Sequence, residues 1–277
     1  MRADQFLLQG AFASSRSQAQ RLIASGVRWR VPQGTWKHIG KNSDELPPDA
    51  VIELLDASEA KYVSRGGLKL EGALKASGVV AQGKTCLDVG QSTGGFTDCL
   101  LQHGASLVVG VDVGSGQLHP SMREHPRVVA LEHINARELK ATELIAVYAL
   151  NSRPGGPIEQ ENIGFDASFD LIVGDLSFIS QTLVLPTLVP LLKPGADLLM
   201  LVKPQFELQP GQVGKGGIVK DAAMYKIVEK RIRDCCAELG LGVLAWFDSS
   251  IVGGDGNREF FVHARRLDDA SVRNEGA

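Results

Sequence analysis

The sequence predicts an α/β protein with a seven-stranded, mostly parallel sheet, preceded by a small α+β domain. Three observations support this prediction. From residue 85 onward, apolar segments of strand length alternate with helical segments, which is the pattern of a parallel sheet covered by helices. A glycine-rich segment follows the first of these strands. Residues 1–41 contain seven lysines and arginines and a single acidic residue, although the whole chain has a net charge of −3.

The composition is that of a globular protein with a sizeable core. The chain has 277 residues, of which 44% are hydrophobic and 22% are charged, and this length suits one large and one small domain. None of the four cysteines forms a Cys-x-x-Cys pair, and no histidine completes a metal set near them. We therefore expect neither a disulfide framework nor a metal site, in keeping with a reducing compartment.

The sequence also argues against a membrane protein. Asp4 and Gln5 interrupt the N-terminus where a signal peptide would be apolar. The longest apolar stretch, Leu183–Leu192, is broken by Pro186 and Pro190 and falls far short of the ~20 residues that a membrane-spanning helix needs. We therefore predict a soluble, cytoplasmic protein without a membrane partner.

Residues 1–60 are expected to form the small domain. A first helix is predicted over Asp4–Ala13. Ser15 and Gln18 form a capping box for a second helix, which stops at Gly26. Strands are predicted over 27–31, where apolar and basic residues alternate, and over 51–55.

The segment MRADQFLLQGAFASSRSQAQRLIASGVRWR resembles the RNA-binding domain named after small-subunit ribosomal protein four. In that family the second helix and the strand after it present basic residues to structured RNA. Such contacts to phosphates give salt-sensitive affinity with little sequence choice. The alternative is a solvated basic face that keeps a small domain soluble. The resemblance implies RNA binding by Arg16, Arg21, Arg28 and Arg30.

Residues 61–84 are expected to link the domains and to carry a short helix that ends near Gly78. Residues 85–267 should form the large domain, and residues 268–277 a polar tail. The last two strands are joined by about ten residues without a helix, so they should pair as an antiparallel hairpin. The predicted strands are 85–89, 107–112, 127–131, 170–174, 197–202, 243–247 and 259–264, and the clearest helices are 96–103, 181–192 and 221–239.

The segment LDVGQSTGGFTD, after the first strand of the large domain, is the predicted cofactor loop. Ligands of such sheets bind at the carboxyl ends of the strands, and glycines there let them approach the backbone. The dinucleotide and phosphate-loop fingerprints are both absent. A glycine-rich loop without a phosphate motif suits S-adenosylmethionine, which has an adenosine but no phosphate. The expected cofactor-binding residues in this loop are Asp88, Gly90, Ser92, Gly94, Gly95 and Phe96.

Two further carboxylates are expected at the same edge of the sheet. Asp112 ends the second strand, where it can accept both ribose hydroxyls of an adenosine. Asp175 ends the fourth strand. The loop and the two aspartates at strand ends together favour a cofactor site over a purely structural turn.

Four polar residues should converge beside that site. Asp175 and Lys203 lie at the carboxyl ends of the fourth and fifth strands, and Glu259 begins the antiparallel last strand. Lys69 begins the helix that runs down to the foot of the first strand. A ribose hydroxyl is a poor nucleophile that needs a base, so this set suits ribose 2′-O-methylation. Our hypothesis is that Lys203 is the base and that Lys69 favours its neutral form and stabilises the developing alkoxide charge. Asp175 and Glu259 would orient the lysines and the hydroxyl.

The combination resembles the TlyA family, known both as haemolysins and as ribosomal RNA 2′-O-methyltransferases. Its methyltransferase half is similar to FtsJ-type enzymes with a Lys-Asp-Lys-Glu tetrad and a Rossmann-like fold. The resemblance implies S-adenosylmethionine-dependent methylation of cytidine ribose in ribosomal RNA, within ribosomal subunits. The matching segments are YVSRGGLKL (Lys69), DVGQSTGGFTD, VGDLSFIS (Asp175), LVKPQFE (Lys203), VGKGGIVKD and GNREFF (Glu259).

The chain departs from that family in two places. Gln91 stands in the loop where a small residue is expected, which would alter the rim of the cofactor site. The segment from about 138 to 168 is longer than the family norm, and its glycines, prolines and asparagines indicate a surface loop.

Two other functions compete with the methyltransferase. A membrane-active haemolysin would need a spanning or strongly amphipathic helix, and the sequence contains neither. A liposome leakage assay separates a membrane-active haemolysin from a methyltransferase, because only the haemolysin would cause leakage. A noncatalytic RNA-binding or assembly factor would have no use for convergent lysines and carboxylates.

Overall fold

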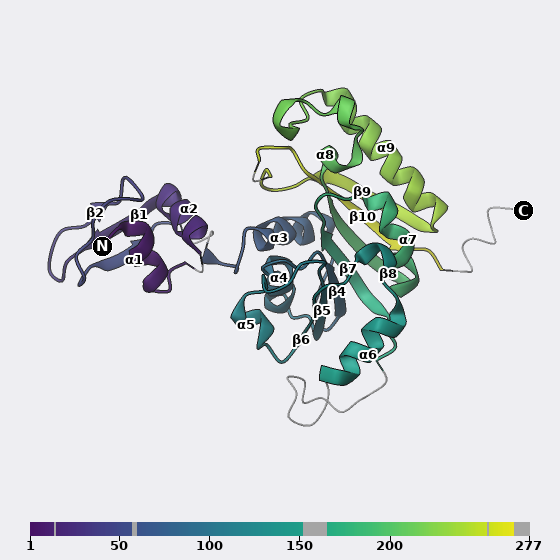
Figure 1. Cartoon of the computed structure of the whole chain (residues 1–277), viewed down its shortest axis with the longest axis horizontal. Coiled ribbons are helices and arrows are strands. Elements are labelled where there is room, and N and C mark those ends of the chain that lie inside the picture. The colour runs from purple at the N-terminus through teal and green to yellow at the C-terminus, as the bar shows by residue number, and fades with distance from the viewer. Residues whose placement is uncertain (14, 57–59, 152–164, 254, 269–277) are drawn as a thin grey trace, which may run out of the picture. The chain divides into compact units, whose positions relative to one another are not determined.

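The computed structural model describes residues 1–13, 15–56, 60–151, 165–253 and 255–268. The chain divides into two compact units, Met1–Leu68 and Lys69–Ala277 (Figure 1). The division falls inside the stretch 61–84 that was expected to link two domains. Of the expected polar tail, only Asp268 is among the described residues.

The first unit contains two helices and a three-stranded antiparallel sheet in the order β2-β1-β3. Ser15 caps the second helix by accepting a hydrogen bond from the Gln18 backbone amide at 3.2 Å, as its capping-box pattern predicts. The apolar faces of the helices pack on the sheet around fully buried Leu7 and Leu22. The elements are α1 (Ala3–Gln9), α2 (Arg16–Gly26), β1 (Val27–Arg30), β2 (Lys37–His38) and β3 (Val51–Leu54).

Two local predictions for this unit are wrong. The first helix was expected to reach Ala13, but α1 ends at Gln9, because Gly10 follows it and Ala11 adopts a left-handed φ of 58°. Strand β2 was not predicted, since its two residues are both exposed and show no apolar alternation.

The second unit is built on a seven-stranded sheet in the order β6-β5-β4-β7-β8-β10-β9. The predicted α/β class and strand number are confirmed. The last strand is antiparallel and lies between β8 and β9, so the expected hairpin of the last two strands is also present. The strands are β4 (Thr85–Val89), β5 (Leu107–Val111), β6 (Val128–Leu131), β7 (Phe169–Asp175), β8 (Leu192–Val202), β9 (Leu241–Asp248) and β10 (Phe260–Arg266).

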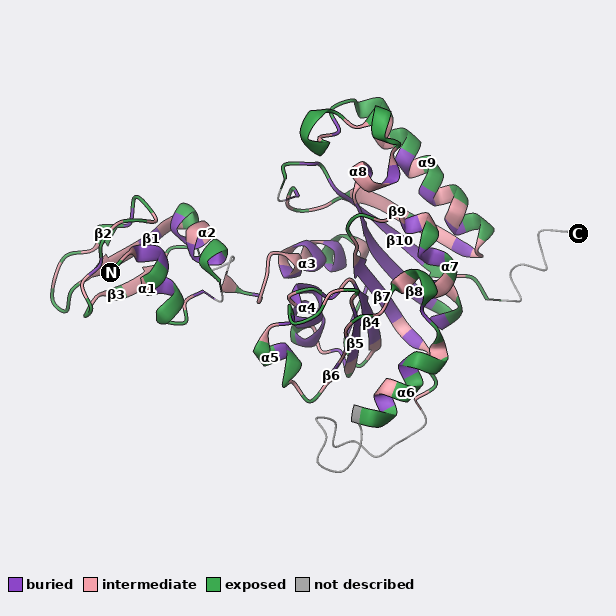
Figure 2. Cartoon of the chain, viewed as in Figure 1, coloured by how far each residue is buried: buried purple, intermediate pink, exposed green. Residues whose placement is uncertain are grey.

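Helices cover the sheet, and their buried stripes face it while their outer faces are exposed (Figure 2). The sheet residues themselves form most of the core, with Phe169 and Ile172 fully buried. Among the described residues, no helix is both long and apolar enough to cross a bilayer. The α-helices of at least one turn are α3 (Gly66–Ser77), α4 (Gly95–Gln102), α5 (Pro120–Arg123), α6 (Ala141–Asn151), α7 (Leu185–Leu188), α8 (Pro204–Glu207) and α9 (Ala222–Glu238).

The predicted helix over 181–192 is instead broken into three short turns. Pro186 and Pro190 each lack the amide that a continuous helix would use, so the segment is interrupted. Its final residue already belongs to β8, which is longer than the predicted 197–202. The turns are the 3₁₀ segment Gln181–Leu183, helix α7 and the 3₁₀ segment Val189–Leu191.

The segment from about 138 to 168 is not a loop throughout. It begins with helix α6, whose Tyr148 is buried and stacks on Phe165 with ring centroids 4.4 Å apart. Residues 152–164, which contain most of the glycines and prolines that indicated a loop, lie outside the described residues.

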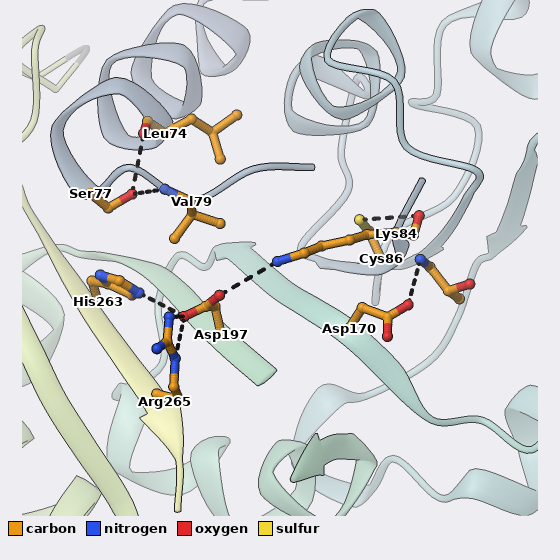
Figure 3. Close-up of polar contacts among 10 residues, drawn as sticks. Leu74, Ser77, Val79, Lys84, Cys86, Asp170, Asp197, His263 and Arg265 are labelled. Carbon is orange, nitrogen blue, oxygen red and sulfur yellow. Dashed lines mark hydrogen bonds and ion pairs between the residues drawn. The ribbon is translucent and has the colours of Figure 1, made fainter. Parts of the chain in front are cut away.

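A buried polar cluster fastens β8 to β10 and to the segment before β4 at the amino-terminal ends of the parallel strands (Figure 3). Asp197 accepts hydrogen bonds from Arg265 at 2.8 Å and lies 3.0 Å from the ring Nε2 of His263. Lys84 lies 3.5 Å from its second oxygen. Burial raises the pKa of Asp197, but the hydrogen bonds of His263 and Arg265 outweigh it and hold the pKa at about 2.

Asp197→Asn is expected to destabilise the protein by roughly 2–3 kcal/mol at pH 7, because it removes a charged acceptor from three donors. The pKa is lowered on folding, so this stabilisation is present above 3.8 and is lost as the pH falls toward about 2. Urea unfolding should therefore show that the difference in unfolding free energy between wild type and Asp197→Asn decreases as the pH falls from 3.8 to about 2. Asp234→Asn, in the exposed pair with Lys230, is the control and should change stability little. An equal effect of both substitutions would contradict the cluster's role.

Candidate active site

A cavity of about 570 Å³ opens at the carboxyl ends of β4, β5 and β7. This is the edge where open parallel sheets bind ligands, and the volume is that of a small-molecule site. Four of the predicted cofactor residues line it: Gly90, Ser92, Asp112 and Asp175. The other lining residues are Val111, Val113, Gln117, Ile134, Asn135, Ala136, Leu176, Ser177, Phe178, Ile179 and Val184.

Gly90 is required where the cavity approaches the backbone. Its φ is +82°, and a Cβ there would lie 2.7 Å from the carbonyl oxygen of Asp175. Any side chain would therefore both strain the turn and push β4 from β7. Three other residues of the predicted loop do not line the cavity: Gly94 caps α4, Gly95 begins it, and buried Phe96 packs against Phe261 at a centroid distance of 6.3 Å.

The carboxylate of Asp112 is fixed at the cavity wall, where it can accept hydrogen bonds from a ligand. Directly after β5, its two carboxylate oxygens accept hydrogen bonds from the backbone amides of Ser92 and Gly114, each at 2.7 Å. These bonds fix the carboxylate, and no cation of the described part of the chain pairs with it, so lone pairs remain for further donors. The position and chemistry fit the two hydroxyls of an adenosine ribose.

Asp88 is completely buried beneath this loop. One of its oxygens accepts from the Thr97 hydroxyl at 2.7 Å, and the other has no partner among the described residues. Burial raises the pKa of Asp88 to about 7. A buried acceptor in this state favours a cationic or hydrogen-donating ligand, so Asp88 fits the ammonium of a bound amino-acid group.

Gln91 does not lie at the rim of the cavity. It is buried, its amide donates to the Thr97 hydroxyl at 2.8 Å, and it packs over Gly110 of β5. A Cβ on Gly110 would lie 2.0 Å from the Gln91 amide, so the glycine provides the space. The expected change of the cofactor rim is therefore wrong, because a small residue on the next strand accommodates the large one.

Asp88→Asn is expected to stabilise the ligand-free protein at pH 8 by a few kcal/mol and to weaken cofactor binding. The folded pKa is above the ordinary value of 3.8, so stability is highest below 3.8 and declines as the pH rises through about 7. The amide mimics the protonated carboxyl and removes that decline. Urea unfolding at pH 6 and pH 8, with calorimetric cofactor binding, measures both effects. A variant less stable than wild type at pH 8 would contradict this explanation.

Lys69 and Glu259 form a buried ion pair at the edge of the sheet where the parallel strands have their carboxyl ends. The Lys69 Nζ lies 2.6 Å from the Glu259 Oε2, and their side chains are 9% and 3% exposed. Lys69 lies in the first turns of α3, and Glu259 directly precedes β10. Although 190 residues separate them, the fold brings the two together as predicted.

Asp175 and Lys203 form a second lysine–carboxylate pair at the same edge. The Lys203 Nζ lies 2.6 Å from the Asp175 Oδ1 and donates to the Ser177 hydroxyl at 2.9 Å. The two residues end or follow neighbouring parallel strands, β7 and β8. Phe260 pairs with Val202 in antiparallel register, so Glu259 and Lys203 leave the sheet at one edge. All four predicted residues therefore gather there as two ion pairs.

Residues that the sequence analysis did not identify complete the surroundings of Lys203. Asp255 accepts hydrogen bonds from the Asn257 side chain at 2.8 Å and from Gln205 at 3.2 Å. Burial raises the pKa of Asp255, but the bonds from Asn257 and the charge of Lys203 lower it overall. Buried Asn257 also accepts from the Val219 amide at 2.9 Å, so it joins the loop before Glu259 to the glycine-rich loop at 214–219.

Glu207 ties the loop after Asp175 to the helix after Lys203. This buried carboxylate accepts from the Ser180 hydroxyl at 2.5 Å and from the Gln181 amide at 2.7 Å. Burial raises the pKa of Glu207 above its ordinary value. These hydrogen bonds connect α8 to the loop after β7. They therefore join the segments that follow Lys203 and Asp175.

The predicted RNA-binding arginines of the first unit are partly engaged with other side chains. Arg16 and Arg2 both pair with buried Asp4 at 3.0 Å, and the Arg2 hydrogen bond holds the pKa of Asp4 well below its usual range. Arg28 pairs with Glu53 at 2.6 Å.

An aromatic residue that the sequence analysis did not identify joins this basic surface. The guanidiniums of Arg28 and Arg30 lie 4.9 and 4.8 Å from the centre of the Trp36 ring. Arg21 is partly buried in α2. The sheet of this unit therefore carries a preassembled cation–aromatic surface.

Comparison with known proteins identifies the family. Residues 62–266 match the FtsJ-like methyltransferases. Over 275 residues the chain is 38% identical to the 16S/23S rRNA (cytidine-2′-O)-methyltransferase TlyA of Mycobacterium tuberculosis, covering 99% of this chain and 93% of that protein. It is 35% identical to Hemolysin A of Brachyspira hyodysenteriae, covering 95% of this chain and 99% of that protein.

A solved structure supports the same relationship. A protein described as a candidate hemolysin from Streptococcus thermophilus matches with a TM-score of 0.69 and 32% identity, covering 97% of this chain and 89% of that one. The residues 62–266 that match the FtsJ-like methyltransferases contain both lysine–carboxylate ion pairs. The chain therefore belongs to the FtsJ-like methyltransferase family, and to the TlyA group within it, as an S-adenosylmethionine-dependent methyltransferase.

Proposed function

We propose that this enzyme methylates a ribose 2′-hydroxyl of ribosomal RNA, with cytidine as the acceptor nucleoside. The observation that carries the proposal is the pair of lysine–carboxylate contacts, Lys69–Glu259 and Asp175–Lys203, at the same edge of the sheet as the cofactor cavity, which Asp175 lines. The names of relatives that are 31–38% identical, which include rRNA (cytidine-2′-O)-methyltransferases, support the substrate. A ribosomal RNA substrate also places the enzyme in the cytoplasm.

In this proposal the cavity binds S-adenosylmethionine, which supplies an electrophilic methyl group. Asp112 would accept hydrogen bonds from the adenosine ribose, Gly90 would leave room for the ligand beside the backbone, and Asp88, buried beneath the loop, would attract the ammonium of the methionine part. These residues position the donor so that the acceptor oxygen can approach in line, and positioning of this kind contributes much of the rate.

Lys203 is the proposed base. Its amine, when unprotonated, takes the proton of the 2′-hydroxyl, and Asp175 at 2.6 Å stabilises the ammonium that results. Lys69, which Glu259 holds in place at 2.6 Å, stabilises negative charge developing on the acceptor oxygen. The tetrad thus combines one proton acceptor, one electrostatic group and two carboxylates that orient them.

The first unit is proposed as an RNA-binding domain of the type named after small-subunit ribosomal protein four. Its basic surface with Arg28, Arg30 and Trp36 offers charge for phosphates and an aromatic ring for a base. Arg16 and Arg21 of α2 extend the same positive charge. Binding through this unit would bring structured RNA to the enzyme, in free RNA or within ribosomal subunits.

The proposal is tested with labelled S-adenosylmethionine and RNA that lacks the modification. Unmodified small and large ribosomal subunits, and the RNA extracted from each, are incubated separately with the enzyme. We expect label in at least one ribosomal RNA, at a position that resists alkaline cleavage. Normal cofactor binding without transfer to any of the four preparations would move the substrate away from ribosomal RNA.

A further inference from the structure

A second cavity of about 600 Å³ lies beside the cofactor cavity and shares Phe178 and Ile179 with it. Its walls come from the 3₁₀ turn after β6, the loop after β7, α8 and α9. No residue of this second cavity other than those two lines the cofactor cavity, so it is a separate site. Its other lining residues are Arg137, Ser180, Leu183, Phe206, Glu207, Leu208, Gln209 and Arg231.

Two arginines contribute positive charge to this cavity, and the charge of Arg231 acts to lower the pKa of Glu207 in the same wall. Among the described residues, neither Arg137 nor Arg231 takes part in an ion pair. Arg231 is anchored, because its guanidinium donates to the backbone carbonyl of Glu207 at 2.5 Å. The Glu207 carboxylate is already satisfied by Ser180 and Gln181. Two arginines in this arrangement favour an anionic ligand, and a guanidinium suits phosphate geometry.

Aromatic rings form another part of the wall. Phe178 and Phe206 lie with ring centroids 4.9 Å apart, and Phe178 is 90% exposed. Phe178 also adopts a left-handed φ of 64°, a conformation that costs a bulky residue free energy. A strained, exposed phenylalanine at a cavity mouth is a surface that a planar ring can cover, and bases stack on such rings.

We propose that this second cavity binds the RNA nucleotide next to the methyl acceptor, with its phosphate at Arg137 and Arg231 and its base against the paired rings of Phe178 and Phe206. This inference rests on the proposed RNA methyltransferase function and extends it to substrate recognition. Because Phe178 and Ile179 line both cavities, the second cavity adjoins the cofactor cavity, and the nucleotide next to the methyl acceptor on the same strand also has to bind near the cofactor. The cavity volume is sufficient for one nucleotide.

The test compares the double variant Arg137→Gln/Arg231→Gln with wild type in the full-length enzyme. We expect the KM for ribosomal RNA and the Kd for RNA, measured by fluorescence anisotropy, to rise about tenfold, and the salt slope of binding to fall by about one per arginine. The calorimetric Kd for S-adenosylmethionine should stay within about twofold, because neither guanidinium lines the cofactor cavity. Phe206→Leu keeps an apolar side chain but removes the aromatic ring. It should raise the KM for RNA and leave the Kd for S-adenosylmethionine unchanged.

Arg233→Gln is the matched control, since Arg233 lies on the same helix but pairs with Glu229 at 2.9 Å and does not line the cavity. It should leave the KM and Kd for RNA unchanged. Suppose that the wild-type enzyme transfers methyl groups to RNA. Equal RNA affinity and equal KM in the double variant and in wild type would then overturn the inference about the second cavity. If wild type transferred no methyl group, the proposed function would fail, and unchanged RNA affinity of the double variant would still reject the cavity.

Discussion

Lys203→Ala is expected to lower the rate of methyl transfer by about 1000-fold or more, because it removes the only proposed proton acceptor for the 2′-hydroxyl. Binding of S-adenosylmethionine should stay within about twofold, since Lys203 does not line the cofactor cavity. The loss should therefore fall on kcat and leave the Kd for the cofactor nearly unchanged. Single-turnover transfer and calorimetry on the same preparation measure the two quantities.

The matched control for Lys203 is Lys193→Ala. Lys193 pairs with Asp170 at 2.8 Å, but it lies at the start of β8, away from the cavity edge. Its loss removes a lysine–carboxylate pair of similar geometry and should leave the rate within about twofold, as expected for a partly exposed pair. Transfer by Lys203→Ala at the wild-type rate would exclude Lys203 as the base.

Glu259→Ala is expected to destabilise the enzyme by about 3–5 kcal/mol and to abolish transfer, because it leaves the buried Lys69 ammonium without its partner. The two side chains are only 9% and 3% exposed, so solvent cannot replace the missing charge. Urea unfolding should show the loss of stability directly. The single variant alone cannot separate a catalytic pair from a structural one.

The double variant Lys69→Met/Glu259→Leu separates them. Replacing both charged side chains with apolar ones leaves no unpaired charge in the interior. Proteins whose buried ion pair is replaced in this way are often as stable as wild type or more stable. We expect unfolding free energy close to that of wild type with transfer still reduced by at least about 100-fold. A stable double variant with normal transfer would show that the pair only holds α3 against the sheet.

Much of the large unit could be predicted from the sequence because its central strands are buried on both faces, as in β5. Short, continuous apolar segments such as Leu107–Val111 are typical of buried parallel strands. The number of strands and their order along the chain therefore follow from the sequence. The helix expected over 181–192 failed for the opposite reason. Its apolar residues have helical spacing, but Pro186 and Pro190 decide the backbone locally.

Three of the four proposed catalytic residues could be placed from the ends of the strands, and Lys69 from the helix that precedes the first parallel strand. Strand order and direction fix which strand ends meet, and Asp175, Lys203 and Glu259 each lie at such an end. Asp255 and Asn257 could not be found this way, because they act through hydrogen bonds within an irregular loop. Their only signal in the sequence is a polar turn directly before Glu259.

Side-chain packing explains the remaining differences. Gln91 turned inward because Gly110 on the neighbouring strand leaves space for it, and a spacing pattern carries no information about that partner. The second cavity is likewise formed by residues from segments more than 90 positions apart, from Arg137 to Arg231. Sequence patterns locate backbone elements, whereas such cavities depend on how those elements meet.

The most direct test of the central claim is the chemical identity of the methylated nucleoside. Ribosomal RNA labelled by the wild-type enzyme is digested completely to nucleosides, which are separated and counted, with Lys203→Ala processed in parallel. Our account predicts label in a single 2′-O-methylated nucleoside, 2′-O-methylcytidine, and background counts for the variant. Label confined to a base-methylated nucleoside would contradict the account, because base methylation does not need the lysine that this edge of the sheet provides.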